Sequence, residues 1–539
     1  MKLNTKLCRV SLSLLIVMVS VTGCSDYLDI NTDPNNPLDS RLDQILPTTQ
    51  TVIFEALGNG SGGMSDLTSQ YVHQTVQRTT TNFYQFIGNE FNISSAWPNL
   101  YSGALMDLNT IIKKATDRES WHYLGIAQVL KAYAFSEMVD MWGKVAFSEF
   151  GQGTTNPFPI YDDGATVYPQ LLSMLQDAVT NLNKTAIETA GSDDLIYGGD
   201  VKKWTRFANS LRLKLYNNVR LTSMYDAAAV EQLINNEDLL DEVDDGFRLL
   251  YGPSSNPENR HPLFVQDYVQ AAPNYIDPYF YLIMKGDPTL PSFNAILSGI
   301  ADPRVPYYFY NQLAGDAPQN LTTSAYWGDF LSVWFASLNI DPNEGFDQGQ
   351  SQTLVGLYPA GGAFDDGSGV TAGVAAKQNP GLGGVAYTRL YGYFAHLYTR
   401  AELALTKGAP GDPRTLFEQA IRASFAEVNA LAETEVPAED AYVDEVLALY
   451  DTGNASKKLE LIMTEKWIAS FGFSVDAYTD YRRTGFPIMF NPNTDNNPFT
   501  ILNRTYPVSI PYFTDDLQIN PNADRQRDPG VDKIFWDVD

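Results

Sequence analysis

Apolar residues at helical spacing recur along this chain, and the segments that carry them come in consecutive pairs. Side chains three and four residues apart share one helical face, so each segment predicts an amphipathic helix. Consecutive antiparallel helices predict a mostly α fold of stacked αα-hairpins, as in a tetratricopeptide-like superhelix. No regular 34-residue repeat accompanies the pattern. The segments cover 100–115, 123–141, 167–182, the residues after Asp200, 390–405, 413–428 and 456–471.

Residues at the ends of these segments give specific helix boundaries. Thr166 is suited to be an N-cap, because its hydroxyl can accept a hydrogen bond from a free backbone N–H. Gly408 follows the 390–405 segment, and glycine is common just after a helix. Asp412 followed by Pro413 predicts an N-cap with proline in the first helical position.

The stretch 251–385 has a different composition from the helical segments on either side. It holds 16 of the 39 glycines and 13 of the 30 prolines of the chain. Glycine and proline at this density predict turns and irregular loops. Because loops carry binding residues more often than the scaffold does, we expect this loop-rich insert to contribute to function.

The N-terminus has the pattern of a bacterial lipoprotein signal. Three Lys or Arg residues among the first nine precede a short apolar run at 12–21, which is too short to span a bilayer. Small residues then lead to Cys24, as in a lipobox, so we predict a signal peptide at 1–23 and an acylated Cys24. The polar residues 24–40 predict a flexible tether. The alternative is an ordinary secretory signal with a chance cysteine.

The charge and the residue counts exclude several functions. A formal charge of −28 argues against nucleic-acid binding, which needs a basic face. Four histidines and two cysteines make a metal site built from these residues improbable, and we assign no metal-ligating residue and expect no cofactor. The Asp-Asp-Gly turns at 162–164, 244–246 and 365–367 leave an oxygen-ligand Ca²⁺ site open, with solvated turns as the alternative. The chain also has no P-loop, no HExxH and no GxSxG motif, so no enzyme signature is evident.

Several short segments together resemble the SusD/RagB family of outer-membrane nutrient-binding lipoproteins, in particular its second SusD-like subfamily. Each segment alone is weakly specific, but they occur in order over nearly the whole chain. Trp142 is a mild departure from the family pattern, and 504–507 matches only roughly. The matching segments are 24–35, 97–109, 132–143, 203–213, 302–304, 400–404, 462–469 and 480–487.

The resemblance implies one α-superhelical domain at 41–539, with 251–385 as its loop-rich insert. It also implies a surface-exposed, lipid-anchored protein of the cell outer membrane that is not an enzyme. Such a protein binds an oligomeric nutrient, most simply an oligosaccharide, and delivers it to a TonB-dependent channel of the SusC type. In this interpretation Trp204, Arg212 and Trp467 belong to the scaffold, and Arg482 and Arg483 tie the C-terminal segment to the helices.

The family places its ligand residues in variable loops, which here correspond to about 70–95 and 270–365. Aromatic rings suit a sugar because a ring face covers the apolar C–H face of a pyranose, while amides bind the hydroxyls. If Trp327 and Trp334 lay on a helix, their spacing of seven would place them on one face. The candidate residues are Gln77, Arg78, Asn82, Tyr84, Tyr275, Tyr279, Tyr326, Trp327 and Trp334.

Two other functions remain open on the sequence. A peptide-binding member of the same fold would need groups that pair with a backbone and a larger volume. A secreted hydrolase would need a nucleophile or a metal, and neither has a motif here. The candidate rings could also pack the loops against the helices rather than face a ligand.

Overall fold

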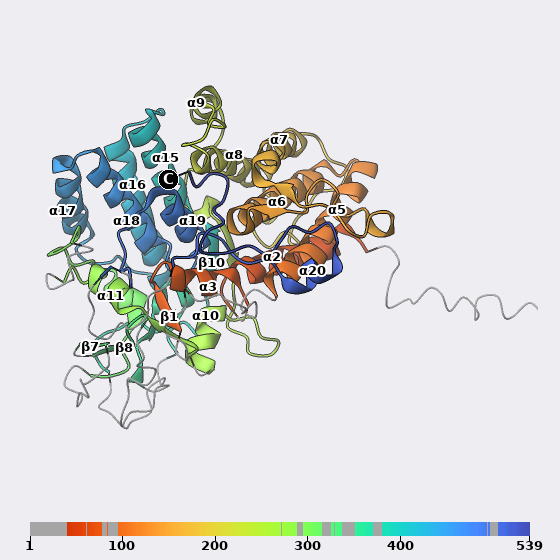
Figure 1. The fold of residues 1–539 in the computed structure, drawn as a ribbon. Helices are drawn as coiled ribbons and strands as arrows, with labels where there is room; N and C mark the ends of the chain where they lie inside the picture. Colours follow the sequence, from red (N-terminus) through yellow and green to blue (C-terminus); the bar gives the residue numbers. More distant parts are fainter. Residues whose placement is uncertain are drawn as a thin grey trace, which may run out of the picture.

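A computed structural model gives the fold as a mainly helical chain with short strands (Figure 1). No helix in the described part of the chain has the length and apolar character needed to cross a membrane. The structure describes residues 40–60, 62–77, 84, 95–270, 272–287, 295–314, 329–336, 351–369, 380–492, 494–495 and 505–538, and the backbone alone at 325–327.

The N-terminal helices pack as sequential neighbours, which confirms the predicted αα-hairpins. The helix α6 packs on α5 and α7, and α7 packs on α8. The side chain of Asp200 caps α8 by accepting hydrogen bonds from the N–H groups of Lys202 and Lys203. The elements are α2 (Leu42–Leu57), α3 (Met64–Tyr71), α4 (Ala96–Pro98), η2 (Asn99–Leu105), α5 (Met106–Asp117), α6 (Trp121–Trp142), η3 (Gly153–Thr155), α7 (Gly164–Leu182), α8 (Val201–Asn218) and α9 (Ala227–Asn236).

The C-terminal helices α15 to α19 form a second group, which lies beside the first in Figure 1, whereas α20 lies against the first group, next to α2. As predicted, Gly408 closes α15 in the left-handed conformation, and Asp412 caps α16 by accepting from the N–H of Thr415. The helix α15 packs against both α16 and α18. The elements are α15 (Tyr393–Lys407), α16 (Pro413–Ala432), α17 (Glu439–Thr452), α18 (Ala455–Ala469), α19 (Val475–Thr484) and α20 (Thr514–Ile519).

The middle of the chain forms only short elements, as its glycine and proline content predicts. The strands pair antiparallel in twos, in the pairs β1–β5, β2–β3, β4–β10, β6–β9 and β7–β8. The bounds are β1 (Thr75–Gln77), β2 (Lys144–Val145), β3 (Asp162–Asp163), η4 (Val243–Asp245), β4 (Phe247–Leu250), α10 (Pro262–Phe264), η5 (Val265–Val269), β5 (Asn274–Ile276), α11 (Pro278–Met284), α12 (Val305–Tyr308), β6 (Phe309–Tyr310), β7 (Ala325–Trp327), β8 (Phe330–Ser332), β9 (Leu354–Val355), α14 (Leu357–Ala360) and β10 (Tyr387–Tyr391).

Two of the predicted scaffold residues are buried, and the third is not. The indole Nε1 of Trp204 donates to Asp194 Oδ2 at 2.7 Å, and that of Trp467 donates to the carbonyl of Val72 at 2.8 Å. Arg212 is only half-buried and donates to its neighbour Asn209, so its scaffold role is corrected to a local contact on α8.

A buried ion network joins three helices that are far apart in the sequence. Glu402 on α15 accepts hydrogen bonds from both Nη atoms of Arg483 on α19, at 2.6 and 2.8 Å. Arg220 Nε, just after α8, lies 3.1 Å from the same carboxylate. Burial raises the pKa of Glu402, but Arg220 and Arg483 outweigh it and hold that pKa well below its ordinary range.

The C-terminal segment is fixed to the helices by Arg482, as expected. Its Nη1 donates to the carbonyl of Val508 at 3.1 Å, and its Nη2 donates to the carbonyl of Asp140 on α6 at 2.8 Å. The same role for Arg483 is wrong, because its guanidinium turns to Glu402 instead.

Two local predictions are also corrected. The N-cap of α7 is Asp163 rather than Thr166, whose hydroxyl donates to the carbonyl of Asp163 at 2.8 Å. Trp327 ends β7 and Trp334 follows β8, so the two do not share a helical face. The two tryptophans would share one face only on a helix, and this part of the chain forms the antiparallel strand pair β7–β8 instead.

Candidate functional site

The strand pair β1–β5 joins the two segments that were predicted to form the ligand site. Val76 lies opposite Tyr275, and Gln77 lies opposite Asn274. Side chains of directly opposite residues are about 5 Å apart on the same face of a strand pair. The two amides of Gln77 and Asn274 are therefore neighbours at the edge of this pair.

This edge opens into a polar cleft of about 790 Å³, which residues of α3, β1, β5 and η5 help to line. Carboxylates and side-chain amides dominate its polar lining. A turn rich in glycine forms one wall of the cleft. Gly60 and Gly62 there have φ of 121° and 87°, and residues that carry a Cβ atom rarely adopt these values. The polar lining residues are Glu55, Asp66, Gln70, Gln77, Ser95, Glu258, Asn259, Arg260, Gln266, Gln270 and Asn274, with Tyr251 beside them.

Asp66 is a half-buried carboxyl of α3 in this cleft. Its Oδ2 accepts a hydrogen bond from Nε2 of Gln266, on η5, at 2.7 Å. Burial raises the pKa of Asp66 to about 7, although the hydrogen bonds from Gln266 and the Gly60 backbone oppose the shift. The carboxyl of Asp66 therefore changes charge near neutral pH.

Gln70 lies one helical turn after Asp66 and is 5% exposed. Its Nε2 donates to the carbonyl of Asp66 at 2.9 Å. Its Oε1 is buried and accepts no hydrogen bond from the described residues. A buried acceptor without a donor costs free energy, so this atom is suited to accept a hydrogen bond from a ligand.

Arg260 is the basic residue of the described lining, and its charge is already paired. Its Nε and Nη2 donate to the two carboxylate oxygens of Glu258 at 2.8 and 2.6 Å. Next to this pair, Asn259 Oδ1 accepts from the N–H of Ser254 at 2.7 Å, which holds the loop in shape.

Three of the predicted ligand-binding rings are buried, so their role is corrected to packing. Tyr275 is 0% exposed, because the alternation of β5 turns it to the core side of the strand pair. Tyr279 on α11 is 1% exposed and stacks on Phe490 with ring centroids 4.3 Å apart. Tyr84 is 7% exposed, and its hydroxyl lies 2.6 Å from Nε2 of His73. None of these rings offers a free face to a sugar.

The structure describes only some of the remaining candidate ligand residues. Gln77 lines the cleft, and its role as a ligand residue stays a prediction. Trp334 is half-buried, with its ring centroid 5.2 Å from that of Tyr279. Arg78, Asn82 and the side chains of Tyr326 and Trp327 lie outside the described residues, as does Cys24. Their roles stay predictions.

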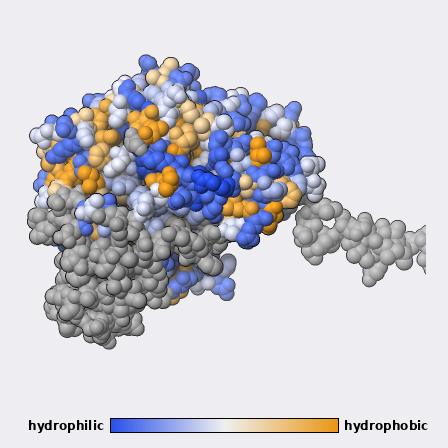
Figure 2. Space-filling view, viewed as in Figure 1, coloured by the Kyte–Doolittle hydropathy of each residue, from blue (hydrophilic) through white to orange (hydrophobic). Residues whose placement is uncertain are grey.

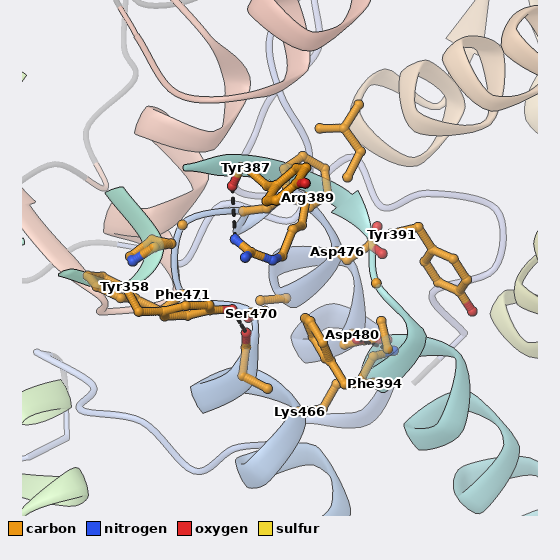
Figure 3. Close-up of a pocket in the computed structure, with 18 residues that line it drawn as sticks. Tyr358, Tyr387, Arg389, Tyr391, Phe394, Lys466, Ser470, Phe471, Asp476 and Asp480 are labelled. Carbon is orange, nitrogen blue, oxygen red and sulfur yellow. Dashed lines mark hydrogen bonds and ion pairs between the residues drawn. The ribbon is translucent and has the colours of Figure 1, made fainter. Parts of the chain in front are cut away.

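A smaller cavity between β10 and the helices α18 and α19 is not suited to an oligosaccharide. Figure 3 shows Arg389, Lys466, Asp476 and Asp480 among the residues that surround it. Its volume of about 30 Å³ has room for about two water molecules. In the described part of the chain, no three His, Cys, Asp or Glu side chains gather closely enough to hold a metal ion.

Several cleft residues were not anticipated from the sequence. Asp66 and Gln70 are four residues apart and so share a face of α3, directly before the predicted Gln77. The spacing of Asp66 and Gln70 can be read from the sequence, but it does not show which face of α3 other elements leave uncovered. Gln266 and Asn259 lie just before the predicted 270–365 segment, and only their fold positions reveal them.

Comparison with known proteins identifies the family. The SusD-like_2 family model, described as starch-binding and associating with the outer membrane, matches residues 34–507. The comparison with curated proteins gives no match. A solved chitin-binding protein aligns with a TM-score of 0.68 and 18% identity, over 93% of this chain and 100% of its own.

Two further solved structures have the same fold. A chitin-binding SusD homologue from Flavobacterium johnsoniae is 19% identical, with a TM-score of 0.62 over 93% of this chain and 99% of its own. A SusD/RagB family protein from Bacteroides thetaiotaomicron is 18% identical, with a TM-score of 0.64 over the same shares of 93% and 99%. This chain belongs to the SusD-like_2 family of nutrient-binding outer-membrane proteins, which bind their ligands without catalysing a reaction.

Proposed function

We propose that this protein is a lipid-anchored surface receptor that binds an oligosaccharide and delivers it to a SusC-type TonB-dependent channel. The observation that carries the proposal is the polar cleft beside β1 and β5, with its neighbouring amides of Gln77 and Asn274. Side-chain amides can both donate to and accept from sugar hydroxyls. The family membership supports a nutrient as the ligand, and the chitin binding of two solved relatives supports a glycan.

The double replacement Gln77→Ala and Asn274→Ala is expected to weaken oligosaccharide binding about tenfold or more, since each lost hydrogen bond contributes about 0.5–1.5 kcal/mol. Isothermal calorimetry of the protein without its first 24 residues, against panels of oligosaccharides and peptides, measures this effect. Gln176→Ala is the matched control, because Gln176 is an exposed glutamine on α7. Binding of peptides alone, or equal affinity in the double variant and the control, would contradict the proposal.

A groove of about 360 Å³ between η2 and α20 supports the partner part of the proposal. Trp97, Phe150 and Phe513 contribute to its mostly apolar lining, and Ile519 at its edge is 69% exposed. Apolar side chains lie among polar ones over the face in Figure 2, including the region of α20. Exposed apolar surface of this kind suits contact with another protein.

The start of the described chain lies close to this groove. Lys114 Nζ on α5 donates to the carbonyl of Ser40 at 2.5 Å, and Met106, at the other end of α5, lines the groove. Eight residues of helix span about 12 Å. If acylated Cys24 anchors the tether that precedes Ser40, the groove lies on the part of the protein nearest the anchor, where a membrane channel can reach it.

Replacing Cys24 with serine is expected to release the protein from the membrane fraction, because acyl chains contribute about 0.8 kcal/mol per buried methylene and serine cannot carry them at this site. Fractionation of cells, with circular dichroism as the control for folding, measures the release. From gently solubilised membranes, the tagged parent protein should also recover a barrel of the SusC type. A Cys24→Ser variant that still sediments with the outer membrane would exclude the lipid anchor, and repeated recovery of the parent without a barrel would exclude the partner.

A further inference from the structure

The charges that line the polar cleft are unbalanced. Its charged residues in the described chain are Glu55, Asp66, Glu258 and Arg260. Arg260 and Glu258 neutralise each other through two hydrogen bonds. Neither Glu55 nor Asp66 forms an ion pair with any described residue, so within the described lining these two carboxyls have no basic partner.

The hydrogen-bonding groups on the α3 wall of the cleft are unbalanced in the same sense. Gln70 Oε1 is a buried acceptor that receives no hydrogen bond from the described residues. Asp66, one turn earlier on the same face of α3, adds carboxylate acceptors, and among the described residues Gln266 and the Gly60 backbone supply its donors. A ligand that fits this wall therefore has to bring donors, and a positive charge would offset the carboxyls.

We infer that the cleft recognises sugars that carry a protonated amine, and that Asp66 and Gln70 together receive that amine. An ammonium group has three donors and no acceptor, which matches an orphan amide oxygen beside a carboxylate. Charge-assisted hydrogen bonds of this type are about twice as strong as neutral ones. Acidic sugars, such as uronates, would place a further anion beside Glu55 and Asp66 and are disfavoured. This inference rests on the proposed function, because it names the class of sugar for the same cleft.

The electrostatics of Asp66 are consistent with this role. Its pKa is raised to about 7 first by burial, and the nearby carboxylate of Asp267 on η5 adds to the shift. Gln266 and the Gly60 backbone act in the opposite direction. A bound ammonium would supply the positive charge that this environment lacks, and would hold Asp66 in its ionised form.

Binding of four oligosaccharides with the same length and β-1,4 linkage tests the inference. The sugars are glucosamine, N-acetylglucosamine, glucose and glucuronate hexamers, measured with the parent protein by calorimetry near neutral pH and at low salt. The glucosamine hexamer is expected to bind about tenfold more tightly than either neutral hexamer, and the glucuronate hexamer least tightly. The preference should weaken at high salt, because screening reduces attraction between charges.

The variant Asp66→Asn keeps the shape of the side chain and removes its charge. It is expected to bind the glucosamine hexamer no more tightly than the neutral ones. Asp177→Asn, at an exposed position on α7, is the matched control and should retain the parent preference. A folding defect would lower the affinity for all four sugars together, whereas loss of the amine preference alone identifies the charge.

The outcomes separate this inference from the proposed function. Tight binding of neutral hexamers without a preference for the amine overturns the inference and leaves the proposed function standing. Tightest binding of glucuronate, or an unchanged preference in Asp66→Asn, also overturns it. If no hexamer binds but a lysine-rich peptide does, both the inference and the oligosaccharide function are overturned.

Discussion

Replacing Glu402 with glutamine is expected to lower the free energy of unfolding by about 3–5 kcal/mol, because Arg220 and Arg483 would both lose the buried carboxylate that they share. Among the described carboxylates, Arg483 would keep only its contact with Asp480. Glu402 is 0% exposed and holds Arg220 and Arg483, from the ends of two other helices. Glutamine keeps the volume of the side chain, so the loss reports charge rather than a cavity. Urea denaturation at neutral pH, followed by circular dichroism, measures the change.

A matched control and the pH dependence make this test specific. Glu418 on α16 pairs with Arg414 and Arg422 at the surface, so Glu418→Gln should cost less than about 1 kcal/mol. The pKa of Glu402 is lowered in the fold from its ordinary value of 4.5, so its stabilisation is present above that pH and declines as the pH falls below it. The gap between parent and variant should thus be constant from neutral pH down to about 5 and shrink below 4.5. A gap as small as that of the control would show that the network is not needed for stability.

The helices of this fold could be predicted because their signals are local. Asp200, Gly408 and Asp412 are found at the expected ends of α8, α15 and α16, where capping depends only on neighbouring backbone groups. Thr166 failed because Asp163 begins α7 three residues earlier, and either residue type is suited to a cap. Local chemistry therefore predicts that a helix exists better than it predicts its first residue.

The candidate ligand site was less predictable than the helices because it depends on contacts between distant segments. Gln77 was chosen from a polar group of residues in the 70–95 segment, and it does line the cleft. Tyr275 and Tyr279 were chosen as aromatic rings of the loop-rich insert, and they are buried. An aromatic residue on a loop can face solvent or the core, and its own sequence does not distinguish the two. The strand register that places Gln77 beside Asn274 fixes this choice, and that register joins residues almost two hundred positions apart.

The C-terminal segment likewise depends on contacts with distant parts of the chain. Its sequence matches the family only roughly, but its contacts with the helices are extensive. Its anchor is Asp140 on α6, which Tyr168 of α7 and Asn218 of α8 also contact. Trp536 Nε1 donates to Asp140 Oδ1 at 2.7 Å, and the guanidinium of Arg482 lies 5.0 Å from the Trp536 ring. One carboxylate thus links three N-terminal helices to a residue near the end of the chain.

Replacing Trp536 with alanine is therefore expected to lower the free energy of unfolding by about 3–5 kcal/mol, since the side chain is 1% exposed and its loss leaves a cavity above Asp140. Urea denaturation measures this change, and limited proteolysis should show faster cleavage within 505–538. Trp536→Phe should cost less, because it keeps most of the packing and loses the hydrogen bond to Asp140. Val538→Ala is the control, because Val538 is 54% exposed and should shift stability by no more than about 0.5 kcal/mol. If Trp536→Ala resembles this control in both measurements, the segment is held by other contacts, and Asp140 is not its anchor.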